Sequence, residues 1–166
     1  MNQQQESERF LELAFADHDA ALALSDIKEN TPHEEGLRWL MQAEADRKGA
    51  QALFDAECFH LVCFLAQQIT EKALKAYLYA QGEELVTGRS INKLIHRCGE
   101  YDSDYLTLRP EAAPLDGLYI PTRYPNAVPD SIPADVFTRP AAVSALEITD
   151  KVLDRVKTWF EKNVDE

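Results

Sequence analysis

The sequence predicts an all-α protein, an antiparallel bundle of four to five main helices with a long proline-rich loop before the last one. Two observations lead to this prediction. Apolar residues recur at spacings of three and four in several long segments, and no segment alternates at period two for long enough to form a sheet. Most of the 8 prolines lie between Pro110 and Pro140, so they interrupt a single part of the chain.

The first two predicted helices span about residues 7–29 and 31–55. The first has an amphipathic stripe at helical spacing. The second has a strong start signal, because Thr31, a following proline and Glu34 have the arrangement of a capping box with proline in the first turn. Gly49 lies inside the second helix and is a candidate for a close crossing with another helix.

The third predicted helix, about residues 56–80, has the clearest buried stripe. A second set of residues, Gln67, Glu71 and Lys75, recurs every four positions on another face. Gly82 is a natural place for the helix to end. The buried stripe consists of Phe59, Val62, Ala66, Ile69, Ala73, Ala76 and Ala80.

Beyond this helix the sequence predicts shorter elements, a loop and a closing helix. Ser90 can cap a short helix, and residues 103–108 are expected to form another helical piece. Residues 109–140 are expected to be mostly irregular, and an ordered loop of this length is often functional. The last helix is expected to begin near Thr138 and carries an almost unbroken apolar stripe.

The composition narrows the class of function. A formal net charge of −12 argues against an extended nucleic-acid surface, which needs clustered Lys and Arg. Cys58, Cys63 and Cys98 have no metal-ligand spacing, so we expect buried thiols and neither a metal nor another cofactor. No segment has the charge pattern of a signal peptide or the ~20 apolar residues of a membrane span. We therefore expect a cytoplasmic protein.

Two motifs resemble a known family. Residues 66–76, AQQITEKALKA, resemble the QxxEKALKA helix of HEPN domains, and residues 119–125, YIPTRYP, resemble the Y-x-x-x-R-Y-P segment that follows it in those proteins. The resemblance covers about residues 37–160. It implies a single HEPN-like domain over the whole chain, with a core at 31–163 and an additional helix at 1–30.

The resemblance implies a homodimer and one of two functional classes. Some HEPN domains are ribonucleases, often toxins of toxin–antitoxin pairs, which use Arg and His from an R-x(4–6)-H motif. Others are associated with nucleotidyltransferases or with nucleotide binding. No His follows Arg123 or Arg139 in this chain, and the one literal match to the motif is Arg89 with His96.

The non-catalytic class offers its own candidate site. Arg123, on a loop stiffened by proline, suits bidentate binding of phosphate or carboxylate. Tyr119 and Tyr124 can supply stacking faces for a base. In the alternative interpretation Arg123 pairs with an acidic residue such as Glu71 and only attaches the loop to the bundle. The third helix would contribute polar groups from Gln68, Glu71, Lys72 and Lys75.

The sequence thus predicts a non-catalytic HEPN module that binds a nucleotide, a nucleotidyltransferase-like partner, or both. The alternative is a metal-independent endoribonuclease that uses Arg89 and His96 across a dimer. A third hypothesis is a purely structural adaptor that binds no nucleotide.

Overall fold

The computed structural model describes residues 29–164. Apart from Glu29, the predicted helix of residues 7–29 lies outside the described residues, and so does the proposed extra helix of residues 1–30 except for its last two positions. Between residues 29 and 164 the chain forms helices and no strand, which confirms the predicted all-α class. Within the same residues, no helix combines the length and the apolar character needed to cross a membrane.

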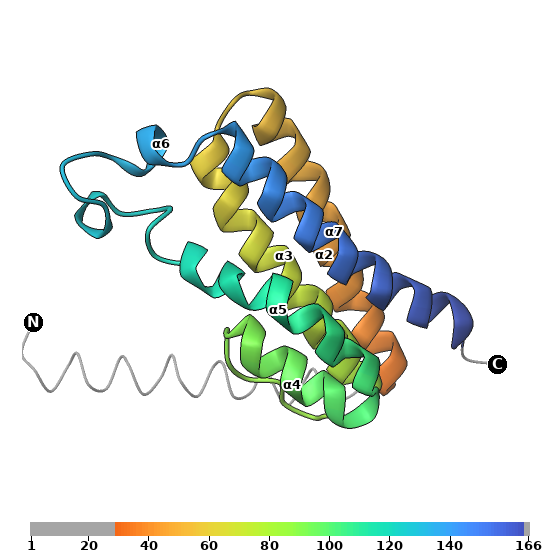
Figure 1. The fold of residues 1–166 in the computed structure, drawn as a ribbon. Helices are drawn as coiled ribbons and strands as arrows, with labels where there is room; N and C mark the ends of the chain where they lie inside the picture. The colour runs from red at the N-terminus through yellow and green to blue at the C-terminus, as the bar shows by residue number, and fades with distance from the viewer. Residues whose placement is uncertain (1–28, 165–166) are drawn as a thin grey trace, which may run out of the picture. The chain divides into compact units, whose positions relative to one another are not determined.

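Four long helices build the bundle: α2 (Pro32–Asp55), α3 (Phe59–Ala80), α4 (Ile91–Tyr101) and α7 (Arg139–Lys162). Helix α3 is central, because it packs against each of the other three. Figure 1 shows α2 and α7 alongside α3, with α4 at one end. The predicted helix bundle is therefore confirmed.

The ends of α2 and α3 follow from local chemistry. The predicted capping box is present, because the Glu34 N–H donates to Thr31 Oγ1 at 3.1 Å and the Thr31 N–H donates to Glu34 Oε2 at 2.8 Å. Helix α3 begins three residues later than predicted, because residues 56–58 form the turn from α2 and Glu57 has a left-handed φ of 59°. Gly82, with φ of 95°, follows the end of α3 as predicted.

The core lies along α3, and its closest approach is to α2. A Cβ on Gly36 would lie 2.6 Å from the Ala76 carbonyl oxygen, so only glycine fits at this crossing. The prediction that Gly49 marks the crossing is wrong, because no atom lies within 4 Å of its Cβ position. Helix α7 contributes its predicted stripe, which is buried at Ala142, Ala145, Leu146, Thr149, Val152, Leu153, Val156 and Phe160.

The region between α4 and α7 has more helix than the sequence predicts. The expectation that residues 109–140 are mostly irregular is wrong for their first part, which continues as short helices up to Leu118. The physical reason is the position of Pro110 and Pro114, which fall in first turns, where the missing N–H has no partner to lose. These elements are η2 (Ser103–Leu108), α5 (Arg109–Ala112), η3 (Ala113–Leu118), η4 (Pro125–Ala127) and α6 (Pro133–Val136).

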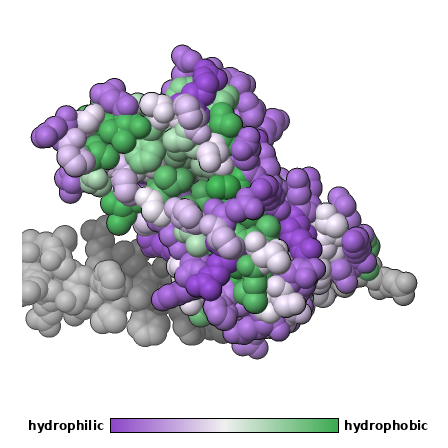
Figure 2. Space-filling view, viewed as in Figure 1, coloured by the Kyte–Doolittle hydropathy of each residue, from purple (hydrophilic) through white to green (hydrophobic). Residues whose placement is uncertain are grey.

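The remaining connection, residues 119–138, is the predicted proline-rich loop. Figure 2 shows apolar side chains gathered on the part of the surface where this loop lies in Figure 1. Four large apolar side chains of the loop are about half exposed: Ile120, Tyr124, Ile132 and Val136. We call Ile120, Ile132 and Val136 the loop face.

Candidate functional site

Arg123, the arginine of the RYP segment, is surrounded by aromatic rings. Its guanidinium carbon lies 4.2 Å from the centre of the Tyr119 ring, 4.8 Å from that of Phe64 and 5.0 Å from that of Tyr124. Its Nε–H also donates to the Tyr119 carbonyl at 2.7 Å. Cation–π contacts of this kind are worth about 0.5–1 kcal/mol each when exposed. The head group of Arg123 is therefore held in place before any ligand arrives.

The loop backbone explains how Arg123 reaches this position. Thr122 is fully buried and its hydroxyl donates to the Leu118 carbonyl at 2.5 Å, which extends η3 by one turn. The Arg123 N–H donates to the Ile120 carbonyl at 3.0 Å and closes that turn. Tyr124 is then extended, with φ of −123° and ψ of 128°, as expected for the residue before a proline. The extended Tyr124, restricted by Pro125 after it, thus ends the turn directly after Arg123.

Arg89 lies against the same tyrosine. Its guanidinium carbon is 4.9 Å from the centre of the Tyr119 ring, and its Nη1 donates to the Tyr119 hydroxyl. Two arginines from distant parts of the sequence therefore share one aromatic ring. We call Arg89, Tyr119 and Arg123, with Phe64 and Tyr124, the Arg–Tyr cluster.

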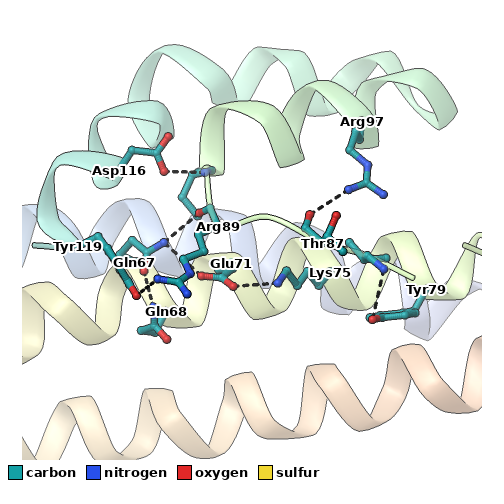
Figure 3. A network of polar contacts seen from close by, with 12 residues as sticks. Gln67, Gln68, Glu71, Lys75, Tyr79, Thr87, Arg89, Arg97, Asp116 and Tyr119 are labelled. Carbon is teal, nitrogen blue, oxygen red and sulfur yellow. Dashed lines mark hydrogen bonds and ion pairs between the residues drawn. The ribbon is translucent and has the colours of Figure 1, made fainter. Parts of the chain in front are cut away.

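Beside the cluster lies a surface hollow of about 330 Å³. It is lined by Gln67, Arg89, Ser90, Asp116 and Tyr119. Figure 3 shows that these residues come from different elements, with Gln67 on α3 and Asp116 on η3. The hollow is polar on the side of Arg89 and aromatic on the side of Tyr119, a combination that suits an anion attached to a flat group.

The charges of the cluster are unusual in so acidic a chain. Among residues 29–164, no carboxylate lies within salt-bridge distance of Arg89 or Arg123. The cluster therefore has two guanidinium groups whose charge no carboxylate of the described residues neutralises by direct contact. The described arginines that do form ion pairs with carboxylates are Arg38, Arg47, Arg97, Arg139 and Arg155.

The polar residues predicted on α3 divide into two groups. Glu71 pairs with Lys75 at 2.9 Å and also accepts a hydrogen bond from Gln67 at 3.3 Å (Figure 3). The Gln68 side-chain amide donates to Gln67 Oε1 at 2.6 Å. The alternative in which Arg123 pairs with Glu71 is wrong, because the carboxylate of Glu71 is occupied within α3 and Arg123 faces aromatic rings.

The two predicted lysines point elsewhere. Lys72 pairs with Asp46 on α2. The Lys75 side chain is only 10% exposed, and its Nζ lies 5.5 Å from the Trp39 ring centre. Neither lysine contacts the Arg–Tyr cluster in the described part of the chain, so the cluster contains the predicted Arg123, Tyr119 and Tyr124 without the predicted lysines.

Arg89 and His96, the two residues of the ribonuclease alternative, have different surroundings. His96 is exposed on α4, whose buried face is formed by Ile91, Leu94, Ile95 and Cys98. Arg89 is engaged with Tyr119, and no hydrogen bond of the described residues joins it to His96. In the described part of the chain, the pair is thus not hydrogen-bonded.

Thiol and metal chemistry find no support. Cys63 and Cys98 are buried as predicted, and Cys58 is half-buried. Burial raises the pKa of the Cys63 thiol to about 11 and raises that of Cys98 further, so both remain protonated and unreactive at neutral pH. Residues 29–164 contain no cluster of His, Cys, Asp or Glu that could hold a metal ion.

Three members of the site were not predicted as such. Phe64 lies outside the buried stripe of α3, and an aromatic residue at such a position can indicate a contact with another part of the protein. Arg89 was considered only with His96, and Asp116 gave no signal, because its partners lie 24 to 26 residues earlier in the sequence.

Comparisons with known proteins agree with this fold. Residues 37–159 match the model of the HEPN domain family. TT1696 from Thermus thermophilus is 37% identical, with a TM-score of 0.70, over 75% of this chain and 97% of that one. ST0689, described as an archaeal HEPN homologue, is 30% identical, with a TM-score of 0.62, over 75% of this chain and 97% of that one. No curated protein gives a significant match. The chain belongs to the HEPN domain family.

Proposed function

We propose that this HEPN domain is a non-catalytic binding module that holds the phosphate of a nucleotide on Arg89 and Arg123. The observation that carries the proposal is the pair of guanidinium groups around the Tyr119 ring, without a carboxylate partner among residues 29–164, in a chain of net charge −12. Arg89 lines the hollow beside the cluster, and an arginine is suited to a phosphate because its planar group donates two parallel hydrogen bonds.

The rings around Arg123 favour a nucleotide over a bare anion. Tyr124 is 49% exposed, so its ring has a face available to stack on a base. The other contacts of Arg123 hold its side chain in place and so reduce the ordering cost on binding. A small ligand is favoured over a long nucleic acid, because most of the remaining described arginines are already ion-paired.

The proposal is tested by titrating ADP and pyrophosphate into the purified protein by calorimetry. Arg123→Ala and Arg89→Ala should each weaken binding by about ten- to a hundredfold, the usual effect of losing a hydrogen bond to a charged group. Arg139→Ala is the matched control, because Arg139 also lies against aromatic rings but pairs with Glu57. The proposal fails if the parent binds neither ligand, or if all three variants bind as the parent does.

We also propose that a second copy of the chain covers the loop face. Half-exposed apolar residues on an ordered loop are a typical docking surface. Around Ile120, residues 117–129 contain no acidic residue, so two chains of net charge −12 can meet at this part of the loop face with little repulsion.

Sedimentation equilibrium tests the dimer. The parent and Met41→Glu, a change at an apolar residue on α2 that is 66% exposed, should sediment as dimers, and Ile120→Glu as a monomer. A monomeric parent would reject the dimer and favour a nucleotidyltransferase-like protein as the occupant of the loop face.

A further inference from the structure

The carboxylate of Asp116 lies at the amino end of α4, just after Arg89. Its Oδ1 accepts from the Ile91 N–H at 2.6 Å, and its Oδ2 accepts from the Asn92 N–H at 3.2 Å and from Ser90 Oγ at 2.8 Å. The positive end of the helix dipole further stabilises a carboxylate at this position. Asp116 therefore attaches η3 firmly to the start of α4.

This attachment determines where Tyr119 lies. Tyr119 directly follows η3, the helix that contains Asp116, so fixing Asp116 on α4 brings the Tyr119 ring to Arg89. From the opposite side Gln67, only 1% exposed, donates to the Arg89 carbonyl at 3.1 Å (Figure 3). The Tyr119 carbonyl in turn accepts from Arg123. One chain of contacts thus runs from Asp116 through Tyr119 to both arginines.

We propose that Asp116 is a positioning residue, which assembles Arg89 and Tyr119 for anion binding without binding the anion itself. This inference rests on the proposed function of the Arg–Tyr cluster. Three donors already occupy the carboxylate, and its negative charge repels an anion in the hollow that it lines. Any favourable effect of Asp116 on anion affinity must therefore act through the placement of Arg89 and Tyr119.

The sign of one substitution separates this role from simple charge repulsion. Asp116→Asn removes the negative charge, so repulsion alone predicts tighter binding of pyrophosphate. Loss of positioning predicts weaker binding, by about three- to tenfold, because Arg89 must then be ordered when the ligand binds. Asp102→Asn is the matched control, since Asp102 caps η2 at the opposite end of α4 and contacts Arg155 and not the cluster.

The experiment has a ligand-free and a ligand-bound measurement on the full chain. First, the side-chain Nε–H signals of Arg89 and Arg123 are recorded by NMR without ligand. Asp116→Asn should shift the Arg89 signal, and Asp102→Asn should leave it in place. Pyrophosphate is then titrated into the same proteins by calorimetry. If Asp116→Asn does not fold, Ser90→Ala is used in its place. This variant removes one of the three donors to Asp116 and should produce a smaller shift of the Arg89 signal.

The outcomes are distinguishable from those of the proposed function. An Arg89 signal that is unchanged in Asp116→Asn, or equally shifted in Asp102→Asn, overturns the positioning role. Tighter pyrophosphate binding by Asp116→Asn overturns it as well. If the parent does not bind pyrophosphate, the proposed function fails, whereas the ligand-free spectra still decide whether Asp116 positions Arg89.

Discussion

Substituting Gly36 by alanine tests the crossing of α2 and α3, and the same helix supplies the control. A Cβ at position 36 would lie 2.6 Å from the Ala76 carbonyl oxygen, 2.8 Å from Phe160 Cζ and 2.9 Å from Ala80 Cβ. At Gly49, farther along α2, a Cβ would meet nothing within 4 Å. The two glycines therefore share a helical backbone and differ in the space beside them.

The two substitutions are expected to change the free energy of unfolding in opposite directions. Alanine is favoured over glycine inside a helix by about 1 kcal/mol, and both variants gain this amount. At position 36 the gain is opposed, because a backbone carbonyl must retreat by roughly 1 Å to reach ordinary contact distance. Overpacking of a close-packed core costs about 1–3 kcal/mol. We expect Gly36→Ala to lower the free energy of unfolding by up to about 2 kcal/mol and Gly49→Ala to raise it by up to about 1 kcal/mol.

Urea denaturation followed by far-ultraviolet circular dichroism measures both changes. The midpoints of the parent and the two variants are compared, and an unchanged slope shows that the unfolded states are alike. If both variants gained stability equally, the two helices would have to lie farther apart at position 36 than the structure shows, and the reasoning would be refuted.

Two further predictions concern pH and catalysis. Stability should fall as the pH rises above about 9, because burial raises the pKa of Cys63 from 9.0 to about 11 and that of Tyr77 from 10.0 to about 12. As the pH rises, the unfolded chain releases these protons before the native state does, so the native state loses stability above about pH 9. Equal urea midpoints at about pH 8 and about pH 11 would contradict this prediction. Metal-free incubation with mixed RNA should give no cleavage, since Arg89 is engaged with Tyr119. Cleavage that is lost in both Arg89→Ala and His96→Ala would replace the binding proposal with the ribonuclease alternative.

The long helices and their ends could be predicted because they depend on nearby residues. The capping box of Thr31 and Glu34 involves residues three positions apart, and the stripe of α7 repeats every three or four. The proline-rich region was harder to predict, since a proline ends one helix or begins the next according to its position. At Pro110 and Pro114 it lies in the first turn of a short helix, so residues predicted to be irregular are helical.

The candidate site, too, was predictable where its residues lie close together in the sequence and not where they lie far apart. The motifs indicated that Arg123, Tyr119 and Tyr124 belong together, because a short loop keeps them close. They also grouped Lys72 and Lys75 with Arg123, since these residue types suit the same ligand. In the structure Lys72 pairs with Asp46 instead, and Lys75 pairs with Glu71.

The sequence by itself therefore determined the HEPN family, the long helices and the two tyrosines beside the RYP arginine, all of which are encoded within short segments. Only the tertiary structure decided which positive charges remain without a carboxylate and that Arg89 joins Arg123 at Tyr119. Packing on α3 and α4 brings these side chains together from distant positions. Whether a charge is neutralised depends on distances of a few ångströms, which the spacing of residues along the chain does not specify.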